Sequence, residues 1–346
     1  MKEQWGHGAW SFHRVDLHRT LGELAAGVGD TEAQATATTP VEIRLGCEVR
    51  GVDCERGVLS MADGTVVQGD LVVIADGAHS RLISDFVGRP TTAQPTGRSV
   101  YRWLVSMDEV MADAELRGQY EGKLPGFLGW HDQEKRVLWV SYTCRGGRVL
   151  NNAIMHDTEA GEGEDDLWHS SASKEQVLKT LVNFHPTALK IVHMASEDGI
   201  KVHRLFKRPP LDSFVRGRTA VVGDAAHVMI PTHAAGGGIA IESAASLEII
   251  FRGVDGADEK TIEERLRLFD ELRLPRCNLT MLASNAGQEW LLVPGVEEEI
   301  RKYYSGPLPP KGSIPWSDEF REVLFHHDEF EAAEKALERV HNDLKT

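Results

Sequence analysis

The stretch GRTAVVGDAAHVMIPTHAAGGGIAIESAASLEIIF, residues 217–251, decides the fold expected of this chain. It begins with a short apolar run of good strand formers, Thr219–Val222, and Gly223-Asp224 follows where such a strand would end. Three glycines, Gly236–Gly238, then open a segment whose apolar residues recur at helical spacing. The stretch therefore predicts a strand, a sharp turn, a loop and a helix that starts at glycine.

A helix that starts with glycines is suited to binding a ligand. Glycine lets a ligand approach the backbone closely, and the free N–H groups at the positive end of the helix dipole favour a phosphate or an electron-rich ring oxygen. Asp224, at the end of a strand, is well placed to accept hydrogen bonds from ligand hydroxyls. From the pattern alone, an ordinary βα unit with a glycine-rich loop remains the alternative.

Composition limits the class of protein. A chain of 346 residues with 41% hydrophobic residues can hold two or three domains or one large α/β body. The net charge of −15 argues against nucleic acid or an anionic membrane surface as the main partner. The sequence contains neither a membrane-length apolar run nor a secretory signal. The four cysteines, Cys47, Cys54, Cys144 and Cys277, form no CxxC pair and are expected to be reduced thiols in a cytoplasmic protein.

The first part of the chain predicts a helix, an antiparallel meander and a buried strand. The helix begins near Val15 or Asp16, and Arg14 lies just before it or in its first turn. Alternating apolar residues and two glycine turns then predict strands at Val41–Leu45, Val58–Met61, Val66–Val67 and Leu71–Ala75. The last of these is a continuous apolar run, typical of a parallel strand buried on both faces, and it ends at Asp76-Gly77.

The remaining segments are expected to alternate between sheet and helix. Strands rich in tryptophan and tyrosine fill residues 97–155; such a sheet could form one wall of an aromatic pocket, although aromatic residues in strands are more often core. Residues 156–173 are expected to form an exposed acidic loop, residues 174–184 a helix and residues 200–206 a strand. Residues 259–290 have helical periodicity that is broken by Pro275. Residues 291–316 are expected to be irregular, and residues 318–344 to form one or two helices.

Three segments together carry a family resemblance: FHRVDLHRTL (12–21), GDLVVIADGAHSRL (69–82) and GRTAVVGDAAHVMIPTHAAGGGIAIESA (217–244). In this order they closely resemble the single-component FAD-dependent aromatic hydroxylases. The nearest look-alikes are the salicylate-hydroxylase-like class A flavin monooxygenases, including those of fungal secondary metabolism. The resemblance covers roughly residues 5–290.

The resemblance implies an α/β fold: a three-layer, Rossmann-like FAD-binding domain with an inserted, mostly antiparallel β-sheet substrate domain. On this basis residues 1–96 and 204–290 are the two parts of the FAD-binding domain. Residues 97–203 are the substrate domain, and residues 291–346 are a C-terminal helical extension.

The resemblance also implies roles for particular residues. The segment ending in Asp76-Gly77 is associated with both FAD and NAD(P)H, Gly223-Asp224 with the ribityl chain, and the glycine loop with the pyrophosphate and flavin ring. The implied cofactor-binding residues are Arg14, Asp76, Gly77, Gly223, Asp224, Gly236, Gly237 and Gly238. Arg102 and Tyr142 match an arginine and a tyrosine of the family's active site, although Thr143 stands where a proline is usual.

The implied reaction is an NAD(P)H-driven hydroxylation or epoxidation of an aromatic or other electron-rich small molecule. In the family NAD(P)H reduces FAD, O₂ adds to give the flavin C4a-hydroperoxide, and its distal oxygen goes to the substrate. The protein supplies position, electrostatics and a dry site. Arg102 or Tyr142 could orient the substrate's oxygen or stabilise its phenolate form. The expected partners are the substrate and O₂, with no nucleic acid and no membrane span, and a homodimer is left open.

The sequence departs from the family at several points. It has no strand–GxGxxG–helix unit for the ADP half of FAD; the nearest string, Gly27–Glu32, lacks the third glycine and follows a helix. Without that unit the parallel sheet would lose its central strand and expose apolar edges. Ala235 replaces the usual glutamine, and Glu242-Ser243 stands where Glu-Asp is usual. We therefore expect an N-terminally truncated enzyme. The alternatives are a short protein that has lost tight FAD binding, and a non-catalytic paralogue that binds an aromatic metabolite or a partner chain.

Two histidines near the glycines offer a different reading. His227 and His233 flank Pro231 and could be metal ligands, but no third ligand is spaced nearby. Histidines in a loop near the flavin are therefore favoured, and no metal is expected. The sequence also contains no HExxH, GxSxG or P-loop motif.

Overall fold

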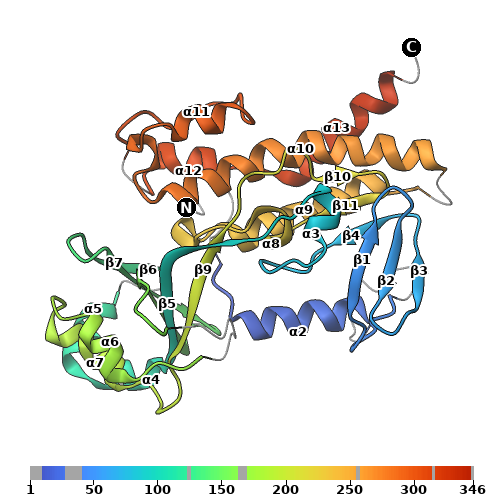
Figure 1. Ribbon diagram of the computed structural model, residues 1–346. Coiled ribbons are helices and arrows are strands. Elements are labelled where there is room, and N and C mark those ends of the chain that lie inside the picture. The colour runs from blue at the N-terminus through green and yellow to red at the C-terminus, as the bar shows by residue number, and fades with distance from the viewer. Residues whose placement is uncertain are drawn as a thin grey trace. The chain divides into compact units, whose positions relative to one another are not determined.

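The computed structural model describes residues 10–27, 41–122, 126–162, 170–254, 258–313 and 316–343 (Figure 1). The chain passes between two compact units. The first contains residues 1–45 and 95–205, and the second contains residues 46–94 and 206–346. Each unit is thus built from stretches that are far apart in the sequence.

An antiparallel sheet forms the body of the first unit. Its five strands lie in the order β6-β7-β8-β5-β9, with β9 beside β5 at one edge. The strands are β5 (Gln94–Ser106), β6 (Phe127–Asp132), β7 (Val137–Cys144), β8 (Val149–Asp157) and β9 (Lys201–Lys207). The sequence predicted strands in all of these regions.

Alternation along the strands gives this sheet two different faces. Tyr101, Trp103 and Val105 of β5 are buried on one face, where they join Trp139 and Ile154 in a single apolar core. Four helices complete that core: α4 (Met107–Ala112), α5 (Ala114–Tyr120), α6 (Lys174–Thr180) and α7 (Pro186–His193) (Figure 1). The strand residues that alternate with these buried ones point to the opposite face of the sheet. That face therefore carries a separate set of side chains.

Helix α2 (Arg14–Ala25) belongs to the same unit and begins within one or two residues of the predicted start. Asp16 in its first turn accepts hydrogen bonds from Arg145 at 2.6 and 2.9 Å. Arg145 lies in the turn between β7 and β8 with a left-handed φ of 53°. The ion pair therefore fixes the start of α2, and with it Arg14, to one end of the sheet.

The second unit begins with the expected antiparallel meander, but its first strand is displaced. The strands are β1 (Val49–Asp53), β2 (Val58–Met61) and β3 (Val66–Gln68), in that order. The predicted strand at Val41–Leu45 is wrong. Leu45 is 88% exposed there, whereas Val49 and Val52 pack against the core of the unit. The alternation at 41–45 therefore has no buried face to stabilise it.

A parallel strand pair lies at the centre of the second unit. β4 (Val72–Ile74) pairs in parallel with β11 (Thr219–Val221), and β10 (Val215–Arg216) adds an antiparallel edge. Within the described part of the chain, β4 has β11 as its one neighbour in this sheet. Val73 is 43% exposed, so the expectation that this strand is buried on both faces is wrong.

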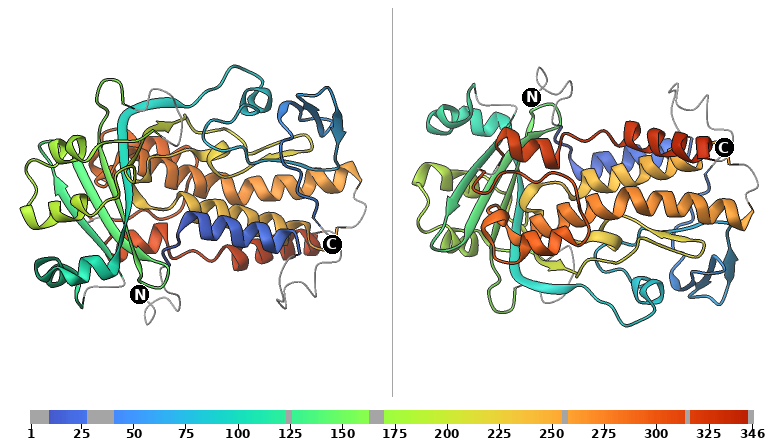
Figure 2. Two further views of the ribbon diagram at one scale, coloured as in Figure 1. Left: turned by 90° about the horizontal axis from the view of Figure 1, so that it is seen from below. Right: turned by 90° about the horizontal axis from the view of Figure 1, so that it is seen from above.

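Long helices pack beside this pair. α9 (Gly236–Phe251), α10 (Glu259–Ala286) and α13 (Glu329–Asp343) contact one another and lie side by side in Figures 1 and 2. The expected break at Pro275 is wrong, since this proline lies inside α10, which is 28 residues long. Proline removes one backbone hydrogen bond, and the burial of this half of the helix outweighs that loss. The shorter helices are α3 (Ile83–Val87), α8 (Asp224–His227), α11 (Val296–Arg301) and α12 (Asp318–Leu324).

Two further expectations concern the surface. The acidic segment at 156–173 is not wholly exposed, because Glu162 is only 8% exposed and its carboxylate lies 3.7 Å from Nε2 of His156. Residues 163–169 of that segment, and residues 28–40 with most of the Gly27–Glu32 string, lie outside the described residues. In the part of the chain that the structure describes, no helix has the length and apolar character needed to cross a membrane.

Candidate cofactor and substrate sites

The two predicted aspartates of the cofactor motifs emerge at the same edge of the second unit. Ile74 of β4 is directly opposite Val221 of β11, and both strands run in the same direction. Asp76 and Asp224 therefore both follow the carboxyl ends of neighbouring parallel strands. This is where ligands bind in open α/β sheets.

Asp76 has a structural task in addition to its predicted one. Its Oδ2 accepts hydrogen bonds from the backbone N–H groups of Arg81 at 2.9 Å and Leu82 at 3.3 Å. Gly77 follows with a φ of 85°, which a residue with a side chain rarely adopts. The Asp76-Gly77 pair thus closes the loop that leads from β4 into α3, and this explains the sequence pattern without reference to a ligand.

Gly223 and Asp224 form the corresponding turn after β11. Gly223 has φ 61° and ψ −149°, a region of backbone space that is essentially restricted to glycine. Asp224 follows as an exposed residue at the start of α8. Its carboxylate therefore remains accessible to a ligand in front of the sheet edge.

The glycines at the start of α9 leave open space. A Cβ atom placed on Gly237 or Gly238 would meet no other atom within 4 Å, and neither residue has a positive φ. Packing within the described chain therefore gives no reason for glycine at these two positions. Ala234, just before the helix, is held in the left-handed conformation with φ 52°, which is strained for an L-residue. The first turn of α9 is thus an accessible, polar surface that a ligand could approach closely.

Arg208 connects the two motifs, and the sequence reading missed it. Its guanidinium is buried and donates to the carbonyl oxygen of Ala225 at 2.6 Å and to that of Ala78 at 3.1 Å. Burial lowers the pKa of Arg208, while the negative charges of Asp76 and Asp224 raise it. The arginine therefore holds both loops together and lies close to both aspartates. The only sequence signal was its place between β9 and the Pro209-Pro210 pair.

A second cluster lies on the first unit, on the sheet face opposite the helical core. The strand register places Arg102 of β5 opposite Ala153 of β8. The same row continues through Val140 of β7 to Gly129 of β6. Directly opposite residues in a sheet share a face. Arg102 is therefore followed across the sheet by a row of small or apolar residues.

Tyr142, His203 and Arg14 are close enough to Arg102 to act on it electrostatically. Burial lowers the pKa of Arg102; Tyr142 raises it and Arg14 lowers it. Burial, together with Arg102 and Arg14, lowers the pKa of His203 to about 4. At neutral pH the histidine is therefore uncharged, and the cluster contains two arginine cations.

The acid–base state of Tyr142 follows from the same surroundings. Burial raises its pKa above the ordinary value, against the opposing effect of Arg102. The phenol therefore stays protonated at neutral pH and can donate a hydrogen bond. The structure brings Arg102 and Tyr142 close to each other and to Arg14, and it adds His203, which nothing in the sequence pattern singled out.

The two histidines considered as metal ligands are both buried. Burial lowers the pKa of His227 and of His233 to about 4. His233 contacts Ser284 through Nδ1 at 3.2 Å and packs against the ring of Phe320. Neither histidine belongs to a cluster of three or more possible ligands within the described ranges. They are uncharged, buried residues at neutral pH, and a place beside the flavin stays a prediction for both.

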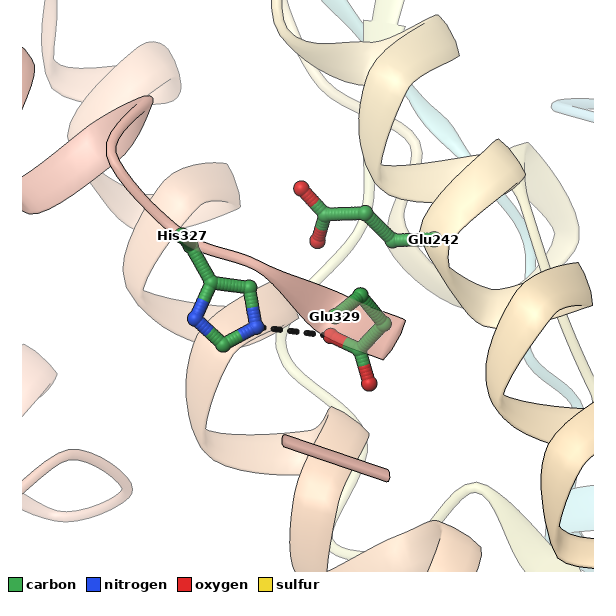
Figure 3. A group of neighbouring side chains, drawn as sticks. All are labelled: Glu242, His327 and Glu329. Carbon is green, nitrogen blue, oxygen red and sulfur yellow. Dashed lines mark hydrogen bonds and ion pairs between the residues drawn. The ribbon is translucent and has the colours of Figure 1, made fainter. Parts of the chain in front are cut away.

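One such cluster exists elsewhere in the described chain, formed by Glu242, His327 and Glu329 (Figure 3). Its carboxylates already have cationic partners. Arg276 donates to both oxygens of Glu242 at 2.7 Å, and Arg273 is bonded to Glu329. A divalent cation would have to displace both arginines, so the donor set fits an ion-pair network and not a metal site.

Comparison with known proteins identifies the relatives of the chain. No family model matches it. The FAD-dependent monooxygenase phomE' of Diaporthe leptostromiformis is 27% identical over 339 residues, which cover 97% of this chain and 81% of the relative. Hispidin-3-hydroxylase of Neonothopanus nambi is 27% identical over 82% of this chain and 67% of its own length. Among solved structures, a salicylate hydroxylase substrate complex superimposes with a TM-score of 0.69 at 20% identity, covering 94% of this chain and 75% of that one.

These findings confirm the fold class and the resemblance read from the motifs. The architecture is that of a FAD-binding fold with an antiparallel substrate sheet, as in salicylate hydroxylase. Over most of its length the chain is similar to FAD-dependent monooxygenases, and its fold is that of salicylate hydroxylase. The roles of the individual site residues stay predictions.

Proposed function

We propose that this protein uses FAD and NAD(P)H to insert one atom of O₂ into an aromatic or other electron-rich small molecule. The observation that carries the proposal is the parallel pairing of β4 with β11. It brings Asp76-Gly77 and Gly223-Asp224 to one sheet edge. The names of the relatives, among them a hispidin-3-hydroxylase, support an aromatic substrate and a role in secondary metabolism.

The residues at this edge fit the ribityl and flavin half of FAD. Asp224, exposed at a strand end, would accept hydrogen bonds from ribityl hydroxyls. The backbone N–H groups of Gly236–Gly238, at the positive end of the 16-residue helix α9, would face the electron-rich oxygens of the flavin. Arg208 would keep the two aspartate loops at a fixed separation. The resemblance also assigns Arg14 to FAD, and that role stays a prediction.

Bound FAD, with NAD(P)H as reductant, would supply the oxygen chemistry. The chain's own residues prepare the substrate. The positive charge of Arg102 favours the ionised, electron-rich form of a phenol, and protonated Tyr142 donates a hydrogen bond to the same kind of oxygen. Neutral His203 adds a polar group without adding a third positive charge.

The cofactor assignment is tested by the flavin content of the purified protein. The wild-type chain should show the visible absorbance of bound flavin, and NAD(P)H should bleach it in the absence of oxygen. Asp224→Ala should abolish flavin binding, whereas Asp212→Ala, at an exposed aspartate outside the two motifs, should leave it unchanged. Equal flavin content in both variants would refute the role of Asp224. A folded but colourless wild-type chain would favour the non-catalytic alternative.

A further inference from the structure

Arg273 of α10 is fully buried against the beginning of α9. Its Nη2 donates to the carbonyl oxygen of Ile239 at 3.2 Å and to Oε2 of Glu242 at 2.9 Å, and its Nε donates to Oγ of Ser243 at 3.3 Å. Ile239 directly follows the three glycines. One guanidinium therefore holds the first two turns of the helix that we assign to the cofactor.

The charge of Arg273 is balanced from another part of the chain. Its Nη1 is bonded to the carboxylate of Glu329, which is 4% exposed and opens the C-terminal helix α13. Oε1 of Glu329 accepts a hydrogen bond from Oγ of Ser246 of α9. Oε2, the oxygen bonded to Arg273, lies 2.8 Å from Nε2 of His327. Figure 3 shows His327 and Glu329 directed toward each other beside Glu242.

Charge in this network is closely matched. Arg273 and Arg276 contribute two positive charges, and Glu242 and Glu329 contribute two negative ones. A buried charge that loses its partner is strongly unfavourable, so Arg273 can occupy its place only while a carboxylate lies beside it. Ser243 contacts Arg273 but carries no charge, and Glu242 is shared with Arg276. Glu329 is therefore the group that keeps Arg273 in position.

We propose that Arg273 and Glu329 are positioning residues for FAD. The C-terminal helix α13 supplies the countercharge that keeps Arg273 against the first turn of α9, and the pair thereby sets both the position of that turn and the electrostatic potential at the flavin. The placement of FAD at α9 rests on the proposed function; the anchoring of α9 by the pair does not.

The test compares three forms of the full-length protein. Glu329→Gln keeps the size of the side chain and removes its charge. Glu331→Gln makes the same change two residues further along α13, where the side chain is exposed and paired with Lys335. In Glu329→Gln/Ser243→Asp the charge returns from the other side of Arg273, because Oγ of Ser243 is 3.3 Å from its Nε.

We expect Glu329→Gln to weaken FAD binding by about tenfold, which corresponds to 1.4 kcal/mol. Because the network then carries one extra positive charge, the midpoint potential of bound flavin should become more positive. Glu331→Gln should change neither quantity, and the double variant should restore both. A packing role alone would leave the potential unchanged. Wild-type affinity and potential in Glu329→Gln would overturn the proposal.

A second measurement is independent of FAD. Hydrogen exchange of the FAD-free protein should show faster exchange at Gly236–Glu242 in Glu329→Gln and wild-type rates there in Glu331→Gln. If the wild-type chain binds no FAD, the proposed function fails and this measurement alone decides whether α9 is anchored. If Glu329→Gln does not fold, Arg273→Met/Glu329→Met removes both charges together. Unchanged exchange at the start of α9 in that folded variant would overturn the proposal.

Discussion

Gly237 offers a direct test of why α9 starts with glycines. A Cβ atom at this position meets nothing within 4 Å, and φ is not positive, so the folded chain accommodates alanine without strain. Alanine is favoured over glycine in a helix by about 0.8–1.0 kcal/mol. Gly237→Ala should therefore stabilise the FAD-free protein, by about 0.5–1 kcal/mol because the position lies in the first turn.

FAD binding should respond in the opposite direction. If the flavin approaches the backbone at Gly237, the added methyl group occupies the same space, and affinity should fall by about tenfold or more, that is by at least ~1.4 kcal/mol. Stability is measured by urea unfolding without FAD, and affinity by titration of flavin fluorescence. Gly118→Ala is the matched control. Gly118 also lies in a helix, α5, with open space at its Cβ position, and its substitution should raise stability without affecting FAD.

The result that would refute the reasoning is a stabilised Gly237→Ala protein with wild-type FAD affinity. That outcome would mean that the ligand does not use the open space at the start of α9. A destabilised variant would instead show that the glycine is required by the fold. The two measurements together therefore separate a glycine kept for a ligand from a glycine kept for packing.

Three further predictions concern buried or half-buried cations and histidines. Arg208→Met should destabilise the protein by about 2–4 kcal/mol in urea unfolding, because one buried and one part-buried carbonyl lose a charged donor. Lys207→Met, at its exposed neighbour, should change stability by less than about 0.5 kcal/mol, and equal effects of the two substitutions would contradict the bridging role. Arg102→Met should raise the KM for a phenolic substrate about tenfold without loss of stability, since burial already disfavours its charge; an unchanged KM would remove Arg102 from the substrate site. Burial lowers the pKa of His227 and His233 to about 4 from 6.5, so the unfolded state binds more protons between these values. Stability should therefore be complete above pH 6.5 and fall as pH drops toward 4, by up to ~1.4 kcal/mol per pH unit for each histidine, and His233→Asn should flatten the profile; an identical slope would show that His233 is not the source.

The sequence was sufficient to predict the elements whose pattern is local. The apolar run at Thr219–Val222 and the glycines at Gly236–Gly238 predicted β11 and α9, because the spacing of side chains in a strand or helix is written directly in the chain. The same local logic failed at Val41–Leu45, where alternation is present but no partner buries it. It failed again at Pro275, where tertiary burial outweighs one lost hydrogen bond.

The sequence by itself also determined the resemblance to FAD-dependent monooxygenases and which aspartates and glycines to expect at a cofactor site, since those motifs are contiguous. Only the tertiary structure revealed Arg208, His203 and the Arg273–Glu329 pair. Arg208 connects loops that are about 150 residues apart, from Ala78 to Ala225, and Arg273 is balanced by a residue 56 positions later. A buried charge takes its role from the partners that surround it in space, and no periodicity along the chain records where those partners will be.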